Sequence, residues 1–396
     1  MSLNDTPSSE RVHIGFFGCT NVGKSSLVNA VTMQEVALVS DVSGTTTDVV
    51  KKAMELLPIG PVMIIDTPGF DDTGILGEKR VKNTKKVIET IDAAVLVCDA
   101  LRGITDADKE LQAMLEGRNV PYITVFNKAD TLKKRDEGLL YVSAKTGEGL
   151  QQLKEMLARI IPRQSNKIRI VDSFIKKGDI VILVTPIDEA APKGRIILPQ
   201  QQVLRNLLDI GSLAVVVQPQ QLESAIGNLA EKPRCIITDS QVFDEVSKIV
   251  PEGILLTSFS ILLAAYKGIL EEAVSAVSHI GQLNDGDKIL IAEGCTHHRQ
   301  CNDIGTVKIP AWIKKHTGKN IDFAFASGHG FDEDLSEYSM VIHCGGCMIT
   351  ERDVLNRMER AKMQNIPFTN YGILIAYING ILKRSIEVFP EIYNLI

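Results

Sequence analysis

The segment from Gly18 to Ser25 has the residue types of a phosphate-binding loop. Its sequence, GCTNVGKS, fits the pattern GxxxxGKS and lies between the apolar run VHIGFF and the helix-like stretch SSLVNAV. Glycine lets backbone N–H groups approach phosphate oxygens, and the N-terminus of the following helix adds positive potential. We expect Lys24 to reach the β and γ phosphates and Ser25 to ligate Mg²⁺. The alternative is a glycine-rich turn without a nucleotide.

Three further motifs argue against that alternative. In DTPG (66–69), the Asp66 carboxylate would hold Mg²⁺ through water and the Gly69 N–H would sense the γ phosphate. In NKAD (127–130), the Asp130 carboxylate would accept N1–H and N2–H₂ of guanine, and adenine would leave that charge unpaired. SAK (143–145) would close over the base with a backbone N–H.

A phosphate loop alone indicates an NTPase, whereas the four motifs in this order predict a GTPase. The residues expected to contact the nucleotide are Asn21, Val22, Gly23, Lys24, Ser25, Ser26, Asp66, Gly69, Asn127, Lys128, Asp130, Ser143, Ala144 and Lys145.

Cysteine and histidine gather in the last quarter of the chain. Cys295-x-His297 directly follows the apolar run KILIAEG, and His343-Cys344-x-x-Cys347 follows YSMVI. If the two runs are parallel strands of one sheet, these side chains converge at the edge where open α/β sheets bind ligands. Both spacings suit metal ligands. The residues alone leave three readings open: structural zinc, an iron–sulfur cluster on the three cysteines, and buried free thiols.

The elements that position these groups alternate between strands and helices. The apolar runs VHIGFFG, VMIIDTPG, AAVLVCDA and PYITVFNKAD each end in a polar or glycine-bearing loop. This rhythm predicts an α/β fold with its chemistry at the carboxyl ends of the strands. It continues to the C-terminus through GDIVILVTPI, RCIITD and KILIAEG. We find no sequence repeat between the units, and we expect one long buried helix over residues 259–280.

The length of 396 residues indicates more than one domain. We predict a disordered tail at 1–10, a nucleotide-binding domain at 11–163, a central α/β domain at 168–262, and a C-terminal α/β domain with a mostly parallel sheet at 265–396.

Composition limits the partners. The sequence contains no run of eighteen apolar residues, and its N-terminus is polar, so we expect a cytoplasmic protein that does not enter membranes. A formal net charge of −6 and the lack of a basic cluster interleaved with aromatic residues argue against a nucleic-acid partner.

The nucleotide motifs resemble those of the GTPase group that includes the tRNA-modification GTPase TrmE and the ribosome-assembly GTPases Era and Der. SGTTTD (43–48) resembles the switch I segment of that group, which implies that Thr46 is a second Mg²⁺ ligand. Asn21 matches a potassium-coordinating asparagine of TrmE-like proteins, which implies K⁺-stimulated hydrolysis; a simple loop residue is the alternative. Phe70 stands where Ras-like proteins carry a water-orienting glutamine, so we expect slow turnover. Glu78 lies where TrmE-like enzymes have a catalytic glutamate; a solvated surface residue is the alternative.

The residues and this resemblance together give four catalytic candidates, namely Lys24, Thr46, Gly69 and Glu78.

The pattern CxH…HCxxC behind such a G domain, with the middle segment VTPIDEAAPKGRIILPQQQ, resembles the FeFe-hydrogenase maturation GTPase family HydF over essentially the whole chain. The resemblance implies a central dimerisation domain and a C-terminal domain that binds a 4Fe–4S cluster. Cys295, Cys344 and Cys347 would be the ligands, and His297 and His343 the motif histidines and further candidate ligands. It implies a homodimeric scaffold or carrier for the di-iron subcluster precursor, with two radical-SAM maturases and apo-hydrogenase as partners.

The competing hypothesis is a TrmE- or Era-like regulatory GTPase, associated with RNA or the ribosome and carrying a structural zinc site. TrmE-like proteins embed their G domain within a helical domain, whereas here the G domain comes first in the sequence. The identity of the bound metal separates the two hypotheses.

Overall fold

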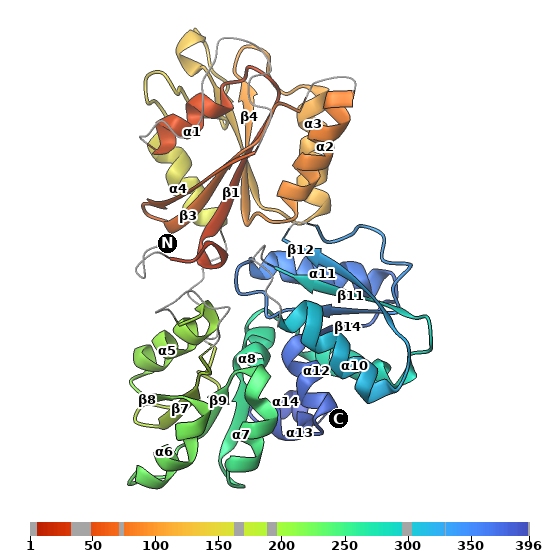
Figure 1. The fold of residues 1–396 in the computed structure, drawn as a ribbon. Coiled ribbons are helices and arrows are strands. Elements are labelled where there is room, and N and C mark those ends of the chain that lie inside the picture. Colours follow the sequence, from red (N-terminus) through yellow and green to blue (C-terminus); the bar gives the residue numbers. More distant parts are fainter. Residues whose placement is uncertain are drawn as a thin grey trace. The chain divides into compact units, whose positions relative to one another are not determined.

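A computed structural model describes residues 6–32, 49–70, 75–161, 170–187, 196–294, 303–328 and 330–394, with only the backbone described for 75–80. The chain divides into two compact units, Met1–Ser165 and Asn166–Ile396 (Figure 1). Each unit is described by itself below.

The first unit is a six-stranded sheet in the order β2-β3-β1-β4-β5-β6. All neighbouring strands are parallel except β2, which runs antiparallel to β3. Helices α1 and α4 cover one face and α2 and α3 the other (Figure 1). The strands are β1 (Val12–Phe17), β2 (Val50–Leu56), β3 (Gly60–Asp66), β4 (Ala93–Asp99), β5 (Tyr122–Asn127) and β6 (Leu140–Tyr141), and the helices are α1 (Lys24–Thr32), α2 (Ile75–Ile88), α3 (Asp106–Gly117) and α4 (Leu150–Ile160).

Alternate residues of the central strands supply the two cores of this unit. Phe16 on β1 packs with Leu27 of α1, while its neighbour Phe17 packs with Leu111 of α3. Both faces of β1 and β4 are buried, which explains their continuous apolar sequences. The carboxyl ends of these strands carry the polar motifs.

The second unit contains two four-stranded parallel sheets, in the orders β10-β9-β7-β8 and β12-β11-β13-β14. The predicted α/β class with a parallel C-terminal sheet is therefore confirmed. The strands are β7 (Ile180–Val184), β8 (Leu213–Val217), β9 (Cys235–Thr238), β10 (Leu255–Ser258), β11 (Lys288–Glu293), β12 (Asp322–Ser327), β13 (Met340–His343) and β14 (Phe368–Asn370). The helices are α5 (Leu198–Ile210), α6 (Leu222–Asn228), α7 (Phe243–Ile249), α8 (Phe259–Tyr266), α9 (Leu270–Ala276), α10 (Ile309–Thr317), α11 (Glu351–Met363), α12 (Tyr371–Ile378), α13 (Leu382–Ser385) and α14 (Pro390–Tyr393).

The two sheets have the same topology, so the expectation of no internal repeat is wrong. In each, the first strand lies inside the sheet, the second forms an edge, and the third and fourth follow on the other side. Topologically equivalent segments also correspond in sequence: TSFSILLAAYKGIL (257–270) matches TNYGILIAYINGIL (369–382). Equivalent residues Ser260 and Gly372 meet where α8 and α12 cross, because a Cβ on Gly372 would lie 2.8 Å from the Ser260 Cβ.

The expectation of one long helix over residues 259–280 is also wrong, since α8 ends at Tyr266 and α9 begins at Leu270. Gly268 has φ +73°, a left-handed conformation that ends helices and that glycine adopts without steric cost. Apolar residues continue across the break because both short helices are buried, which hides the boundary from a periodicity analysis. Among the described residues, no helix is long and apolar enough to cross a membrane.

Candidate functional site

The P-loop joins β1 to α1 at the carboxyl edge of the first sheet. Gly18 has φ +143°, and a Cβ there would lie 2.2 Å from the Val97 carbonyl oxygen, so only glycine fits. The buried Lys24 donates from Nζ to the carbonyl oxygens of Gly18 (3.0 Å) and Cys19 (2.7 Å). Its ammonium group is thereby held over the loop. Asn21 is exposed with φ +63°.

Two of the residues predicted to hold Mg²⁺ lie together, Ser25 at the start of α1 and Asp66 at the end of β3. Ser25 Oγ donates to Asp66 Oδ2 at 2.7 Å, and Asp66 is only 1% exposed. The second carboxylate oxygen, Oδ1, is buried and has no hydrogen-bond partner among the described residues. Burial raises the pKa of Asp66, while Ser25 and Lys24 act in the opposite direction. A buried carboxylate with one oxygen that accepts no hydrogen bond, next to a hydroxyl group, suits a hard cation such as Mg²⁺. Thr46 lies outside the described residues.

The DTPG segment packs directly against the P-loop. A Cβ on Gly69 would lie 2.3 Å from Thr20 Oγ1 and 3.0 Å from the Thr20 Cα, so the two loops touch through glycine. The Phe70 N–H donates to the Gly18 carbonyl at 3.3 Å, and the Phe70 side chain is buried with Phe17 in the core. Phe70 therefore cannot orient a water molecule. Glu78 lies on α2, and its side chain is outside the described residues.

Asn127 connects three motifs of the nucleotide site. Its Nδ2 donates to the carbonyl oxygens of Val22 (3.0 Å) and Gly23 (3.3 Å) in the P-loop. Its Oδ1 accepts the Ala144 N–H at 3.2 Å. The Asn127 side chain is buried, so it acts as a strap between the P-loop and the SAK segment.

Lys128 and Asp130 flank the place where the base is expected. Lys128 has φ +65°, and its Nζ lies 2.6 Å from Asp99 Oδ2. Asp130 is exposed, and its Oδ1 accepts from Ser143 Oγ at 2.7 Å, which lowers the pKa of Asp130 and keeps it charged. Lys145 is also exposed and Ser26 is half-buried. The structure thus brings the P-loop, DTPG, NKAD and SAK segments to one edge of the sheet.

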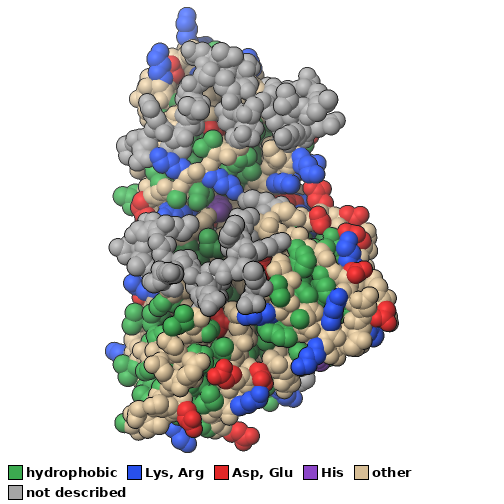
Figure 2. Space-filling view, viewed as in Figure 1, with side chains coloured by type: hydrophobic (Ala, Val, Ile, Leu, Met, Phe, Trp, Pro, Cys, Tyr) green, Lys and Arg blue, Asp and Glu red, His purple; other side chains and the backbone are tan. Residues whose placement is uncertain are grey.

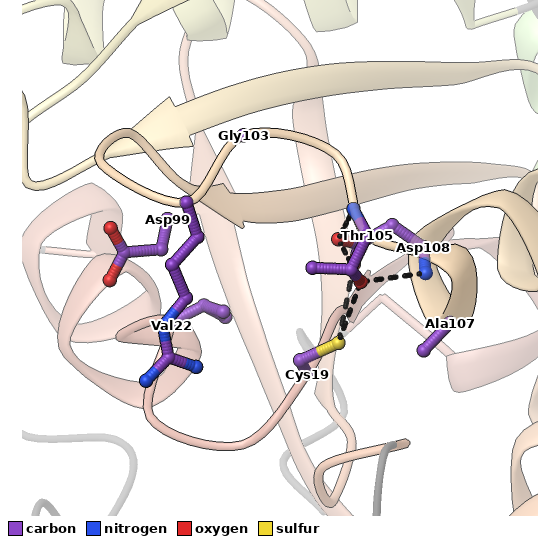
Figure 3. Close-up of a pocket in the computed structure, with 8 residues that line it drawn as sticks. Cys19, Val22, Asp99, Gly103, Thr105, Ala107 and Asp108 are labelled. Carbon is purple, nitrogen blue, oxygen red and sulfur yellow. Dashed lines mark hydrogen bonds between the residues drawn. The ribbon is translucent and has the colours of Figure 1, made fainter.

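A cavity of about 160 Å³ lies beside the P-loop (Figure 3). Cys19 and Val22 of the P-loop line one part of it. The sequence analysis did not single out the other lining residues, which include Thr105 and Asp108. Thr105 Oγ1 donates to Asp108 Oδ2 at 2.7 Å, and the Cys19 thiol donates to Asp108 Oδ1 at 3.6 Å. Thr105 and Asp108 also form the capping box of α3. This buried carboxylate supports the P-loop through its contact with Cys19, and the signal that could have found it is TxxD at the start of an amphipathic helix.

The cysteine site lies at the carboxyl edge of the sheet that contains β11 and β13. These strands are parallel neighbours, as the convergence argument required, and Ala292 pairs with His343. The Cys344 Sγ accepts backbone N–H groups from Gly294 (3.1 Å) and Gly346 (3.4 Å). Burial raises the pKa of Cys344, and the two amide hydrogen bonds oppose that shift. Such amide donors stabilise a thiolate and are a feature of cysteines that bind iron–sulfur clusters.

The other candidate ligands differ in their placement. Cys347 is half-buried against the core that contains Leu263. Cys295 and His297 lie outside the described residues, in the segment that begins directly after Gly294. Within the described ranges no group of three His, Cys, Asp or Glu side chains could hold a metal ion.

His343 is fully buried, and both of its ring nitrogens have partners. Nδ1 lies 2.7 Å from the Cys344 carbonyl oxygen, and Nε2 lies 3.3 Å from Nη1 of Arg357. Burial and the Arg357 charge lower the pKa of His343 to about 3, so the ring is neutral. Its role as a ligand stays a prediction. The sequence analysis missed Arg357, which carries no local signal.

Comparison with known proteins agrees with this architecture. Residues 13–128 match the family model for a 50S ribosome-binding GTPase, residues 170–268 the hydrogen maturase F dimerization domain, and residues 271–388 the hydrogen maturase F tetramerization domain. The chain belongs to the hydrogen maturase F (HydF) family. The family predicted from the motifs is thus confirmed, and so is the GTPase domain.

The first unit is also similar to curated GTPases. The tRNA modification GTPase MnmE of Legionella pneumophila is 38% identical over 156 residues, 37% of this chain and 34% of that protein. MnmE of Nitrosomonas europaea is 35% identical over 165 residues, 40% of this chain and 36% of that protein. The chain spans about a third of the length of these relatives. Among solved structures, Era of Aquifex aeolicus is 20% identical, covers 52% of this chain and 92% of its own, and has a TM-score of 0.36.

Proposed function

We propose that this HydF-family GTPase is a scaffold on which the di-iron precursor of the FeFe-hydrogenase active site is assembled, and a carrier that delivers it to apo-hydrogenase. The observation that carries the proposal is Cys344, whose sulfur receives two backbone N–H groups at the edge where the segment containing Cys295 begins. A zinc-bound thiolate accepts similar hydrogen bonds, so these bonds do not distinguish the two metals. The argument for iron over zinc is the membership in the HydF family.

A 4Fe–4S cluster would be held by Cys295, Cys344 and Cys347. The donor set is consistent with this, because Cys344 and Cys347 follow β13 and Gly294, the residue before Cys295 in the sequence, donates its N–H to the Cys344 sulfur. With three thiolate ligands, such a cluster would supply one iron with an exchangeable position for the precursor. His297 remains a further candidate for that position.

In the G domain, Lys24 would neutralise the β and γ phosphates, while Ser25, Asp66 and Thr46 would hold Mg²⁺ and Asn21 would hold K⁺. The Gly69 N–H would sense the γ phosphate, and Glu78 would act in hydrolysis. We expect slow turnover because Phe70 is buried in the core, and K⁺ stimulation because Asn21 would hold the ion. GTP would order the switch segments and hydrolysis would relax them, which changes how the cysteine site meets its partners.

The chain would act as a homodimer in the cytoplasm, with radical-SAM maturases as partners. Edge strand β8 exposes Leu213 (59%) and Val216 (43%), and α5 exposes Leu208 (60%) nearby in the sequence. Figure 2 shows hydrophobic side chains gathered over this part of the second unit. An exposed apolar edge strand is a template for pairing with another copy. Leu213→Lys should reduce the oligomeric mass measured by light scattering, whereas Leu101→Lys, at a similarly exposed position (65%) in the first unit, should not.

The deciding experiment is anaerobic reconstitution of the full chain with iron and sulfide, followed by metal analysis and EPR. The wild type should give a reducible 4Fe–4S signal that Cys295→Ala, Cys344→Ala and Cys347→Ala each abolish. Cys98→Ala is the matched control, because that thiol is fully buried on β4 in the core of the G domain. Zinc at unit stoichiometry without a cluster would refute the scaffold and favour a regulatory GTPase.

The role of GTP is tested separately. Lys24→Ala should abolish both GTP binding and hydrogenase maturation. Maturation that persists without GTP binding would show that the two are not coupled.

A further inference from the structure

A buried arginine lies beneath the cysteine site. Arg357 on α11 is 4% exposed, and its Nε donates to Asp353 Oδ1 at 2.9 Å. Its Nη2 donates to the Gly328 carbonyl oxygen at 2.6 Å, and its Nη1 lies 3.3 Å from His343 Nε2. One guanidinium therefore joins the first turns of α11 to the ends of β12 and β13.

The hydrogen bonds of His343 fix its tautomer. A carbonyl oxygen can only accept, so the contact of Nδ1 with the Cys344 carbonyl requires a proton on Nδ1. Arg357 can only donate, so Nε2 must offer its lone pair. The ring also stacks on Phe368, with centroids 5.7 Å apart. Neither nitrogen is then available to a metal.

A second buried cation holds the other end of the same loop. Lys267, at the end of α8, is 3% exposed, and its Nζ donates to the Ile349 carbonyl oxygen at 2.9 Å. Ile349 in turn packs on the backbone of Gly294, where a Cβ would lie 3.0 Å from its Cγ1. The loop from His343 to Ile349 carries both described cysteines of the site, and a buried cation contacts each of its ends. Asp353 pairs with Arg357, and the charge of Glu293 acts on the pKa of the Cys344 thiol in the opposite sense to that of Arg357.

We propose that Arg357 is a positioning residue that withholds His343 from ligation and, together with Lys267, offsets the negative charge of the cysteine site. The inference deepens the proposed function and rests on it, because it takes Cys344 as a cluster ligand. A buried cation favours the more negative, reduced form of a cluster and so raises its reduction potential. His343 would then order the loop through the Cys344 carbonyl rather than bind iron.

The first test needs no cluster. In the full-length apo-protein labelled with ¹⁵N-histidine, NMR should show His343 protonated on Nδ1 and unprotonated on Nε2. In Arg357→Met, His343 should no longer be held in this single tautomer. Arg357→Lys should have the same effect, because lysine lacks the planar guanidinium that reaches three acceptors at once. A proton on Nε2 in the wild type, or the same tautomer in both variants, would overturn the positioning role.

The second test uses the reconstituted protein in an EPR-monitored redox titration. Arg357→Met should lower the ratio of reduced to oxidised cluster at a fixed potential about tenfold, a shift of about 59 mV for one electron. Arg357→Lys keeps the charge and covers the case in which the methionine variant does not fold, so its midpoint should stay near the wild-type value. Arg360→Met is the matched control, because Arg360 lies on the same helix and over the same Phe331 ring but outside this network.

Two results would refute the charge role or the exclusion of His343. The first is an unchanged midpoint in a folded Arg357→Met variant. The second is a histidine nitrogen coupling in the wild-type EPR spectrum that His343→Gln removes. A wild type that forms no cluster would refute the proposed function together with the charge role, while the NMR result alone would still decide whether Arg357 fixes His343.

Discussion

Replacing Asn127 by alanine should loosen the nucleotide site without removing any group that the sequence motifs assign to phosphate or Mg²⁺. The substitution deletes the two hydrogen bonds to the Val22 and Gly23 carbonyls and the one from the Ala144 N–H. Each hydrogen bond contributes about 1 kcal/mol net, so the strap contributes about 3 kcal/mol. This corresponds to a roughly hundredfold change in a local opening equilibrium.

Hydrogen exchange on the nucleotide-free full-length protein measures that opening directly. Amides of residues 18–27 and 142–150 should exchange roughly a hundredfold faster in Asn127→Ala, while those of the second unit keep their wild-type rates. GTP affinity should fall as well, because part of the binding free energy is spent on reordering the two segments.

Asp130→Ala is the matched comparison on the same motif. Asp130 is exposed and bonds to Ser143, so its removal should lower the preference for GTP over ATP and leave exchange in the P-loop within a few-fold of the wild type. If Asn127→Ala lost GTP affinity while exchange stayed unchanged, Asn127 would act on the base directly, and the strap interpretation would be refuted.

Three further outcomes are expected in the G domain. Gly69→Ala places a Cβ 2.3 Å from Thr20 Oγ1 and 3.0 Å from its backbone, so the loops must separate and GTP turnover should fall at least about tenfold; an unchanged kcat would contradict this contact. Phe70→Gln should cost about 3 kcal/mol of unfolding free energy, seen as a lower Tm, and should not accelerate hydrolysis, because the side chain packs in the core. Burial raises the pKa of Asp66, so the Mg²⁺-free protein should gain stability as the pH falls through that pKa and lose it as the pH rises. Mg²⁺ affinity should weaken over the same acidic window, which titration with a fluorescent nucleotide measures; Asp66→Asn should remove this pH dependence.

The sequence by itself predicted the chemistry of residues that lie on continuous segments. The P-loop motif needs only neighbouring residues, because its glycines, Lys24 and Ser25 act through one short turn and the helix that follows. The alternation of apolar runs and helical stretches likewise determined the α/β class, and the CxH and HCxxC spacings pointed to one sheet edge. The fold-class inference succeeds because the physical requirement and the sequence pattern span the same few residues, while the cysteine ligand set stays a prediction.

The tertiary structure decided what depends on residues far apart in the chain. The pairing of Asn127 with Val22, and that of Arg357 with Gly328 and His343, follows from which parallel strands are neighbours, and no local spacing encodes that order. The repeat within the second unit is clearest in its strand order, and the sequence carries it in the matching segments 257–270 and 369–382. The break at Gly268 was hidden for a related reason: burial on all sides imposes apolar residues whether or not the helix continues, so hydrophobicity alone cannot mark where it ends.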